Sequence, residues 1–575
     1  MMKYIKEKKG LVVVSLVISF CQVIISLWQP NLTSKIIKNL NTIDAAGNVS
    51  IDQHAVFNAG ILVISVGIIG LLLGIINTFI AAKISTFAGT HLRSDVFKKI
   101  QKFSYQQIEK FSVSHLIVRL TNDVTQVQNL IMAMFQLVLR IPLMFIGCII
   151  FTIMSVPKYW WTTFLYIFIV VIVMIITIRS LMPKFKINQI ATENLNTIVK
   201  QNVDGSRVVK SFVQEDKEEA DFKKEVDGYS KNFKKIGMSF GLLIPFVTLV
   251  ANLIVLFVLF NLSSVGIKDP NSLANIVSFS QYIMILMFTV VNGGFMMNQL
   301  GRAMVSVRRI DEILDVKEDN PYKTKTIKEI KNMSFNNVDF TYASSSKPTL
   351  QDISFEINKG EKVGIIGPTG SGKSTLVQLI AQLFYPTKGT IKINGEDQFV
   401  YNHDELLKHI AIVLQKANLF SGDIESNLYN ANQEATEVDL VWASDIAQAS
   451  EFISKKPDGF KSEVYQKGAN FSGGQKQRLS IARGLMKKPD ILILDDSTSA
   501  LDAQSEKLVK DAIYSDLKDM GVVIVAQKIS SIIETDKIIV LNEGSIEAIG
   551  THKDLLEMSK TYQEIYLTQK EEDNE

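Results

Sequence analysis

The stretch Glu361–Phe384, EKVGIIGPTGSGKSTLVQLIAQLF, decides the fold of the second half of this chain. A short aliphatic run typical of a buried strand leads into a glycine-rich loop, and the loop leads into a helix-like pattern. The loop follows the spacing G-x-x-x-x-G-K-[ST] from Gly367 to Ser374. Backbone N–H groups of such a loop, together with the helix N-terminus, hold phosphates. The stretch therefore predicts an α/β domain that binds a nucleoside triphosphate.

The chemistry of this loop names the first site residues. Lys373 is expected to contact the β and γ phosphates, and Ser374 is expected to bind Mg²⁺. The residues predicted to bind ATP here are Gly367, Thr369, Gly370, Ser371, Gly372, Lys373, Ser374 and Thr375.

Two adjacent carboxylates follow a second aliphatic run, in ILILDDSTSALD from Ile491 to Asp502. Such a pair repels itself and loses hydration at the end of a buried strand, so a cation or a hydrogen-bonded ligand is expected to hold it. Asp495 is placed to bind the Mg²⁺ through water, as the acidic strand end does in P-loop enzymes. The sequence therefore predicts that Asp495 and Asp496 face the nucleotide.

The first half of the chain is predicted to cross a membrane six times. Five stretches without Lys, Arg, Asp or Glu reach the roughly 20 residues that span a bilayer, and a sixth is interrupted only by Arg140, which can snorkel or face the protein interior. A soluble core of six helices would need polar stripes that these stretches lack. A cleaved secretory signal is not expected, because the first run is long and has no small-x-small site after it. The predicted spans are Gly10–Ser34, Ala55–Ala82, Val124–Val156, Tyr159–Ile178, Ile236–Ile267 and Asn271–Gly301.

The positive charges predict the orientation of these spans. Seven Lys and Arg lie between Lys83 and Leu130 and twelve between Arg179 and Lys235, against four in the three opposite loops. The two basic loops, the N-terminus and the nucleotide-binding domain are therefore expected in the cytosol, with the spans in the cytoplasmic membrane. Both basic loops are long and helix-like, so the membrane helices are expected to continue into the cytosol. We expect a membrane domain over residues 1–320, a charged linker over 321–332 and a nucleotide-binding domain over 333–575.

The overall composition excludes two other classes of partner. The 61 Lys and Arg nearly balance the 58 Asp and Glu, so the net charge does not indicate a nucleic-acid partner. The two cysteines, Cys21 and Cys148, lie in apolar runs and have neither the number nor the spacing of a disulfide framework or a zinc site.

A third motif, FSGGQKQRLSIARGL from Phe471 to Leu485, resembles the signature of ATP-binding cassette (ABC) transporters. With six spans fused N-terminally, the whole chain resembles a half-transporter of the ABC exporter type. The resemblance implies an α-helical membrane domain of six transmembrane helices with long cytoplasmic extensions, fused to an α/β P-loop nucleotide-binding domain. It also implies ATP hydrolysis coupled to transport, with ATP and Mg²⁺ as cofactors.

The resemblance assigns further residues. Tyr342 would stack on adenine, and Gln415 would sense Mg²⁺ and contact the membrane domain. Asp502, in SALD, would communicate across the dimer of nucleotide-binding domains. The segments HLIVRLTNDV (115–124) and GSRVVKSF (205–212) resemble the loops that dock on those domains. The signature residues that would face the ATP of a partner chain are Ser472, Gly473, Gly474 and Gln475, the last of which marks the expected start of a helix.

The chain departs from the family pattern at two positions used for hydrolysis. The residue after the Mg²⁺-site aspartate is usually Glu, which polarises the attacking water, and here it is Asp496, whose carboxylate is more than an ångström shorter in reach. The switch segment GVVIVAQKISSI carries Gln527 where His is usual, and an amide cannot supply the charge of a protonated imidazole. Tyr465 and Gln466 depart more mildly from a usual Gly and Glu.

These departures predict a heterodimer. In the family each ATP lies between the P-loop of one chain and the signature of the other, so Asp496 and Gln527 weaken only the site built on this chain's Lys373. The expected partner is a second half-transporter with Glu and His at these positions. A homodimer in which Asp and Gln work adequately is the alternative.

The substrate is less readable than the nucleotide site. Met and Phe side chains of the last span suit an adaptable apolar site, which favours export of hydrophobic or amphipathic small molecules. These side chains are Met284, Met287, Phe288, Phe295, Met296 and Met297. A lipid flippase is the nearest alternative. An ATP-gated channel or a non-transporting sensor complex is a more distant one, because Arg140 is the one cation well inside a span and the outer loops are short.

Overall fold

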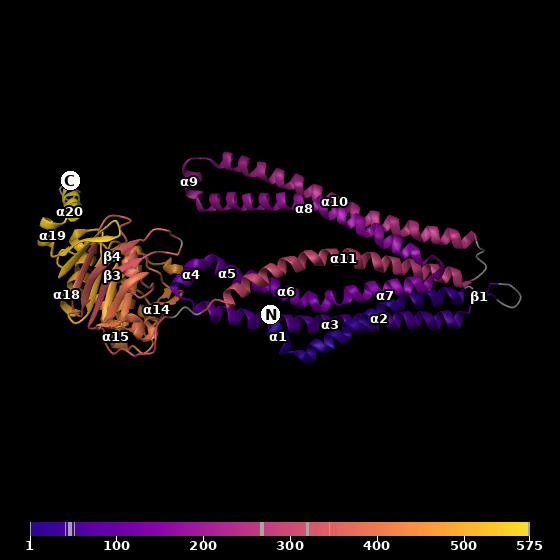
Figure 1. The fold of residues 1–575 in the computed structure, drawn as a ribbon, viewed down its shortest axis with the longest axis horizontal. Helices are drawn as coiled ribbons and strands as arrows, with labels where there is room; N and C mark the ends of the chain where they lie inside the picture. The colour runs from indigo at the N-terminus through magenta and orange to yellow at the C-terminus, as the bar shows by residue number, and fades with distance from the viewer. Residues whose placement is uncertain are drawn as a thin grey trace. The chain divides into compact units, whose positions relative to one another are not determined.

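The computed structural model describes residues 2–40, 42–43, 49–50, 52–264, 270–317, 321–343 and 345–572 (Figure 1). Its contacts separate two compact units, one of Met1–Lys99 with Leu116–Val316 and one of Ile100–His115 with Lys317–Glu575. A short segment of the first predicted cytosolic loop thus belongs to the same unit as the P-loop.

The first unit is helical. Six helical runs of its described residues are long and apolar enough to cross a membrane, which confirms the six predicted spans by length and composition. Several far exceed a span, because a helix of 49 residues such as Gln53–Gln101 is about 70 Å long and a bilayer core is about 30 Å thick. Its helices are α1 (Met2–Lys6), α2 (Lys9–Leu40), α3 (Gln53–Gln101), α5 (Val113–Val118), α6 (Val124–Ala133), α7 (Arg140–Ser155), α8 (Trp160–Asp204), α9 (Ser206–Ser211), α10 (Glu215–Ser264) and α11 (Pro270–Leu314).

Short irregular elements complete this unit. Two π-helical turns, Arg119–Asp123 and Met134–Val138, separate α5, α6 and α7, and a 3₁₀ turn over Pro157–Tyr159 precedes α8. The strands β1 (Thr42–Ile43) and β2 (Val49–Ser50) pair antiparallel between α2 and α3. In Figure 1, α8 and α10 run side by side and are joined through α9.

Small residues and satisfied polar groups hold the membrane helices together. Asn77 of α3 accepts from the Ser15 hydroxyl at 2.7 Å and donates to that of Ser19 at 3.1 Å, so all three buried groups of this cluster find partners inside the protein. A Cβ atom at Gly147 would lie 2.2 Å from the Leu27 side chain, so a larger residue there would force Leu27 to move where α7 packs on α2. Van der Waals packing and internal hydrogen bonds therefore fix the bundle.

A buried charge ties the base of α6 to α11. Asp123 is 1% exposed and accepts a hydrogen bond of 2.6 Å from the Ser306 hydroxyl, with Arg309 at 3.9 Å. One turn away Arg119 pairs with Glu312 at 3.0 Å. Because a buried carboxylate needs such partners, these contacts fix the register of the two helices.

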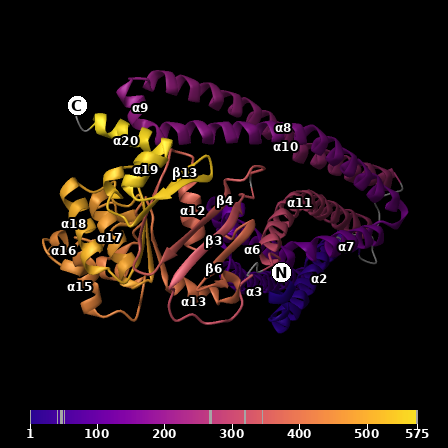
Figure 2. The same ribbon diagram turned by 60° about the vertical axis from the view of Figure 1, so that its left-hand side comes forward.

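The second unit is an α/β domain with two sheets. The larger has the order β14-β13-β5-β12-β11-β8, in which β14 alone runs antiparallel, and the smaller has the order β4-β3-β6-β7. The larger sheet's strands are β5 (Lys362–Ile366), β8 (Ile410–Val413), β11 (Ile491–Asp495), β12 (Gly521–Val525), β13 (Lys537–Asn542) and β14 (Ser545–Gly550). The smaller sheet, seen in Figure 2, has β3 (Asn332–Phe340), β4 (Leu350–Asn358), β6 (Lys388–Ile393) and β7 (Glu396–Asp397), and a further pair is β9 (Gly422–Asp423) with β10 (Glu463–Val464).

The helices of this unit surround the sheets. They are α4 (Tyr105–Phe111), α12 (Lys373–Ile380), α13 (His403–Lys408), α14 (Ile424–Tyr429), α15 (Glu437–Ile446), α16 (Ser450–Ile453), α17 (Gly473–Met486), α18 (Ala503–Asp516), α19 (His552–Met558) and α20 (Lys560–Glu572).

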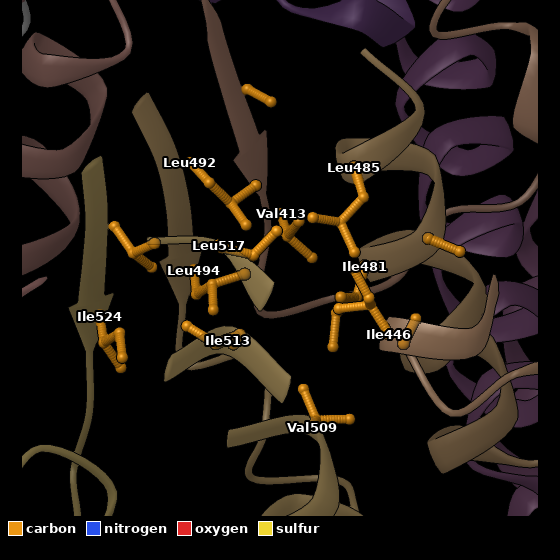
Figure 3. Packing of buried hydrophobic residues seen from close by; sticks show 14 of the residues in the cluster. Val413, Ile446, Ile481, Leu485, Leu492, Leu494, Val509, Ile513, Leu517 and Ile524 are labelled. Carbon is orange, nitrogen blue, oxygen red and sulfur yellow. The ribbon is translucent and has the colours of Figure 1, made fainter. Parts of the chain in front are cut away.

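Strand β11 separates two hydrophobic cores because successive side chains of a strand point to opposite faces. Leu492 and Leu494 face the core made with α17 and α18 (Figure 3), whereas Ile491 and Ile493 join the core on the other face. Both faces are covered, as expected for a parallel sheet. Because both faces of β11 are packed, Asp495 is held in a fixed position at the carboxyl end of this strand.

The segment expected as a linker packs on this unit. Tyr322, Ile327 and Ile330 are buried in the core that also contains β3 and β5, and the Tyr322 hydroxyl donates to Gln382 at 2.9 Å. Residues 321–332 are thus attached to the α/β domain along most of their length.

Candidate nucleotide-binding site

The P-loop joins β5 to α12 with a backbone that needs glycine. Gly370 and Gly372 have φ values of +85° and +98°, where L-residues are strained. A Cβ atom at Gly367 would lie 2.1 Å from the Leu541 carbonyl oxygen, and one at Gly372 would lie 2.6 Å from the Leu350 side chain. The loop is therefore held tightly against β13 and β4 in the shape that the motif predicts.

The loop contains polar groups that suit a phosphate. The Lys373 ammonium donates to the carbonyl oxygens of Gly367 at 2.7 Å and Pro368 at 2.9 Å, so it lies folded over the loop. Burial lowers the pKa of Lys373, against the opposing effect of the Asp496 and Asp495 carboxylates. The Ser371 hydroxyl is buried and has no hydrogen-bond partner among the described residues. An anion in the loop would satisfy both groups.

The carboxylate pair provides an anionic site beside Lys373. Burial raises the pKa of Asp495, and the neighbouring Asp496 carboxylate raises it further. An Mg²⁺ ion would relieve this repulsion, and the exposed Ser374 hydroxyl opens α12 on the same loop. No group of three or more His, Cys, Asp or Glu gathers among the residues that the structure describes, so a site made of one carboxylate, one hydroxyl and phosphate oxygens is the arrangement that fits. Bound Mg²⁺ would neutralise charge on the β and γ phosphates.

Asp496 is tied by two amides. Its Oδ2 atom accepts from Gln415 Nε2 at 2.8 Å and from Gln527 Nε2 at 2.7 Å. Its backbone has φ +47°, a left-handed conformation that Asp adopts more readily than most residues. The three residues come from the ends of three neighbouring strands, β8, β11 and β12, so the sheet brings them together. Both amides therefore hold the same carboxylate oxygen, Oδ2, and fix the orientation of the Asp496 side chain.

Tyr342 lies beside the P-loop helix. Its hydroxyl is 3.0 Å from the Thr375 hydroxyl and donates to Gln378 Oε1 at 3.1 Å. Its ring meets Phe340 and Phe384 edge-on, with centroids 4.9 and 5.5 Å away. Gln378 was not predicted as a site residue, although its place on α12 one turn after Ser374 was a usable signal. These contacts fix the ring that is proposed to stack on adenine.

The signature opens α17 two residues earlier than expected. The helix begins at Gly473 and not near Gln475, because Ser472 is its N-cap. The Ser472 hydroxyl accepts from the Gln475 amide at 3.2 Å, and Gln475 Oε1 accepts from the Ser472 amide at 3.1 Å. This capping box uses the acceptor of the Ser472 hydroxyl and leaves its proton available for an anion.

Gly474 of the signature and Asp502 of the SALD loop both lie at the start of a helix. A Cβ atom at Gly474 would lie 3.2 Å from the Ala500 carbonyl oxygen, so the helix start packs against the SALD loop. Asp502 is the N-cap of α18 and accepts from the Ser505 amide at 2.9 Å. The Ser505 amide lowers the pKa of Asp502.

A short helix within the helix-like first basic loop belongs to the α/β unit. In α4 the Tyr105 ring meets Phe384 edge-on at 5.3 Å, and Gln107 Nε2 donates to the Lys317 carbonyl oxygen at 3.1 Å. The segment 115–124, expected to dock there, lies in the membrane unit except for His115. That the segment 115–124 docks on an ATPase domain stays a prediction. The capping box of Ser104 and Gln107 was the sequence signal for this helix.

The second expected docking segment forms α9, at the turn between α8 and α10. Phe212 is 70% exposed, and Val213 beside it has φ +52°, which is strained for a β-branched residue. Tyr465 is also exposed. Of the methionine and phenylalanine side chains expected to line the last span, those of Phe295 and Met297 lie outside the described residues.

Comparison with known proteins places both halves in one family. Residues 350–499 match the family model of the ABC transporter, and residues 12–290 match that of the ABC transporter transmembrane region. The chain is 32% identical to the ABC transporter ATP-binding protein YfiB of Bacillus subtilis, over 99% of this chain and 98% of that protein. It is 32% identical to YknU of the same organism, over 83% and 82% of the two chains.

A solved structure has the same fold. The structure of a bacterial Atm1-family ABC exporter with ATP bound matches with a TM-score of 0.77 and 22% identity, over 98% of each chain. The predicted fold class and the predicted ATPase are thereby confirmed. The fold, the P-loop with its carboxylate strand, and both family matches together establish that this chain belongs to the ABC transporter family, as an exporter half-transporter that fuses a membrane domain to an ATPase domain.

Proposed function

We propose that this chain is one half of a heterodimeric ABC exporter, and that the ATP site on its own P-loop binds ATP but hydrolyses it weakly. The partner would be a second half-transporter with Glu and His at the positions of Asp496 and Gln527. The pair would move hydrophobic or amphipathic compounds across the cytoplasmic membrane, with both ATPase domains in the cytosol.

The observation that carries this proposal is the pair of amides on Asp496. A general base must reach within about 2.6–3.2 Å of the water whose proton it takes. Asp496 is one methylene short, and its Oδ2 atom is held by Gln415 and Gln527 at 2.8 and 2.7 Å. Gln527, which stands where histidine is usual, thus donates a hydrogen bond to Asp496, which stands where glutamate is usual. Two altered positions that contact each other favour a site kept for binding over one kept for hydrolysis.

The signature of the same chain supports the asymmetry. Ser472, Gly473, Gly474 and Gln475 keep the family pattern, and their helix start is capped and ordered. In a dimer these residues would meet the γ-phosphate of the partner's nucleotide. The chain would therefore complete a working site on its partner while carrying a weak one itself.

Exposed apolar side chains in α9 and directly after it supply a surface for the partner. Val208, Phe212 and Val213 are 59%, 70% and 79% exposed at the tip of the second cytosolic loop. Such a tip is expected to be covered in the assembled transporter. We propose that it docks on the ATPase domain of the partner chain.

The test is ATP hydrolysis by the purified full chain, alone and after addition of the partner encoded beside it. The chain alone is expected to bind ATP and to turn over far below the 1 s⁻¹ scale of ordinary enzymes, and the partner is expected to restore turnover. Replacement of Lys373 by Met in each chain in turn shows which P-loop the turnover depends on. Turnover by the chain alone at 1 s⁻¹ or faster would refute the heterodimer.

A further inference from the structure

A cavity of about 620 Å³ lies between three membrane helices, α2, α10 and α11. Its volume is in the range of ordinary small-molecule sites. Met284 and Phe288 of α11 and Val255 of α10 form part of its apolar wall. The first two were expected from the sequence to line a substrate site, and the cavity places them beside groups that were not singled out.

Three carboxamides contribute to the same lining. Gln29 of α2, Asn252 of α10 and Gln281 of α11 line the cavity, with Ser26 and Ser280 beside them. The cavity has no Lys, Arg, Asp, Glu or His among its lining residues. Within the part of the chain that the structure describes, no hydrogen bond is formed by the side-chain amide of any of the three.

The three carboxamides are open to a molecule in the cavity. Gln29 and Asn252 are exposed and Gln281 is half-buried, so each amide can pair with water or with a bound ligand. Each of the three presents two N–H donors and one carbonyl acceptor. Together they match a molecule that itself carries both donors and acceptors, as amide and hydroxyl groups do.

The lining of the cavity also lacks charged side chains. A permanent cation loses hydration on entering such a site, and no carboxylate in the lining compensates for it. Carboxamides next to Met284 and Phe288 instead favour an uncharged molecule with an apolar body.

We propose that this cavity binds uncharged amphipathic compounds that carry several amide or hydroxyl groups, and that Gln29, Asn252 and Gln281 recognise those groups. The inference rests on the proposed export function, whose substrate class it narrows. It excludes lipophilic cations as the preferred ligands of this site.

The test is equilibrium binding to the full chain in lipid nanodiscs without ATP. The probes are radiolabelled N-acetyl-Leu-Phe-Leu-amide, which is uncharged and rich in amides, and tetraphenylphosphonium, which is a permanent cation. The capped peptide is expected to bind more tightly than the cation. Gln281→Met and Asn252→Leu keep the approximate side-chain shape and remove the hydrogen-bonding atoms, so each is expected to weaken peptide binding about fivefold.

The matched control is Gln136→Met, which changes a carboxamide of the third span that does not line the cavity. It should leave peptide binding within twofold. A gain-of-binding variant, Gln281→Glu, covers the case in which the apolar variants do not fold. At pH 8 it adds a carboxylate to the lining and should raise the affinity for tetraphenylphosphonium at least about fivefold.

Tighter binding of the cation than of the peptide by the unmodified chain would overturn the inference. So would unchanged peptide binding in folded Gln281→Met and Asn252→Leu, with loss of dimer cross-linking in the same variants, because the amides would then pair with the partner chain. Binding without ATP is independent of hydrolysis. Rapid turnover by the chain alone would therefore refute the heterodimer and leave the measured peptide site standing.

Discussion

Replacing Asp496 by Glu and Gln527 by His in the same chain is expected to raise ATP hydrolysis at the ATP site that we propose to be weak. The purified full chain, without a partner, is the protein to test, because every site in its homodimer contains the altered pair. We expect ATP turnover to rise at least about a hundredfold over the unmodified chain.

The magnitude follows from the contacts of Asp496. Turning this short carboxylate toward the attacking water would break the hydrogen bonds that its Oδ2 atom accepts from Gln415 and Gln527, at 2.8 and 2.7 Å. At about 1 kcal/mol each for exposed groups, the two bonds amount to roughly 30-fold in rate. Restoring a general base of the right length should raise the hydrolysis rate about 10²–10⁴-fold, and this factor includes the effect of freeing the carboxylate from its hydrogen bonds.

The single variants separate the two effects. Gln527→His alone removes one of the two amide contacts, or about 1 kcal/mol, and should raise turnover about fivefold. Asp496→Glu places a longer side chain at φ +47°, which costs about 1 kcal/mol of stability, so its melting temperature is measured beside its activity. Adding Lys373→Met to the double variant must return turnover to background.

The assay is steady-state phosphate release in lipid nanodiscs, with ATP binding measured separately. If the unmodified chain alone hydrolyses ATP as fast as the double variant, Asp496 already acts as a base and the reasoning fails. A double variant that is folded and binds ATP but shows no rise would equally refute the role given to the two amides.

Three further experiments, with five substitutions, test other parts of the site. In the heterodimer that we propose, Gly474→Val should lower ATP turnover at least about 100-fold, because the larger side chain would block donors that face the partner's nucleotide. Asp496→Asn should change ATP turnover less than about threefold. Asp495→Asn removes a carboxylate whose pKa is raised by burial, so the ionised form destabilises the fold above that pKa. Without Mg²⁺ the variant should therefore melt about 2–3 °C higher than the unmodified chain. The additional stabilisation by Mg²⁺ with ATP should be lost, and thermal unfolding measures both effects. Tyr342→Ala should weaken ATP binding about tenfold through lost stacking, and Tyr342→Phe, which loses only the hydroxyl contacts, should stay within about threefold in the same titration.

Local features of the sequence were sufficient for the fold class and for locating the P-loop between a strand and a helix. The P-loop from Gly367 to Ser374 is one continuous backbone segment, and its glycines meet positive φ or close backbone contacts at their own positions. The six spans depend on the length and apolarity of single segments, which a bilayer selects without regard to the rest of the chain. The identity of the short carboxylate Asp496 and of Gln527 was likewise visible in the sequence.

Contacts between distant segments were decided only in the folded chain. Asp496 meets Gln415 and Gln527, which are 81 and 31 residues away, because β8, β11 and β12 lie side by side in one sheet. In α4, Tyr105 contacts Phe384, and no local sequence pattern predicts a contact between two residues so far apart in the chain. The three carboxamides of the membrane cavity come from three helices and show no common motif, because helix packing alone brings side chains so far apart in sequence to one lining.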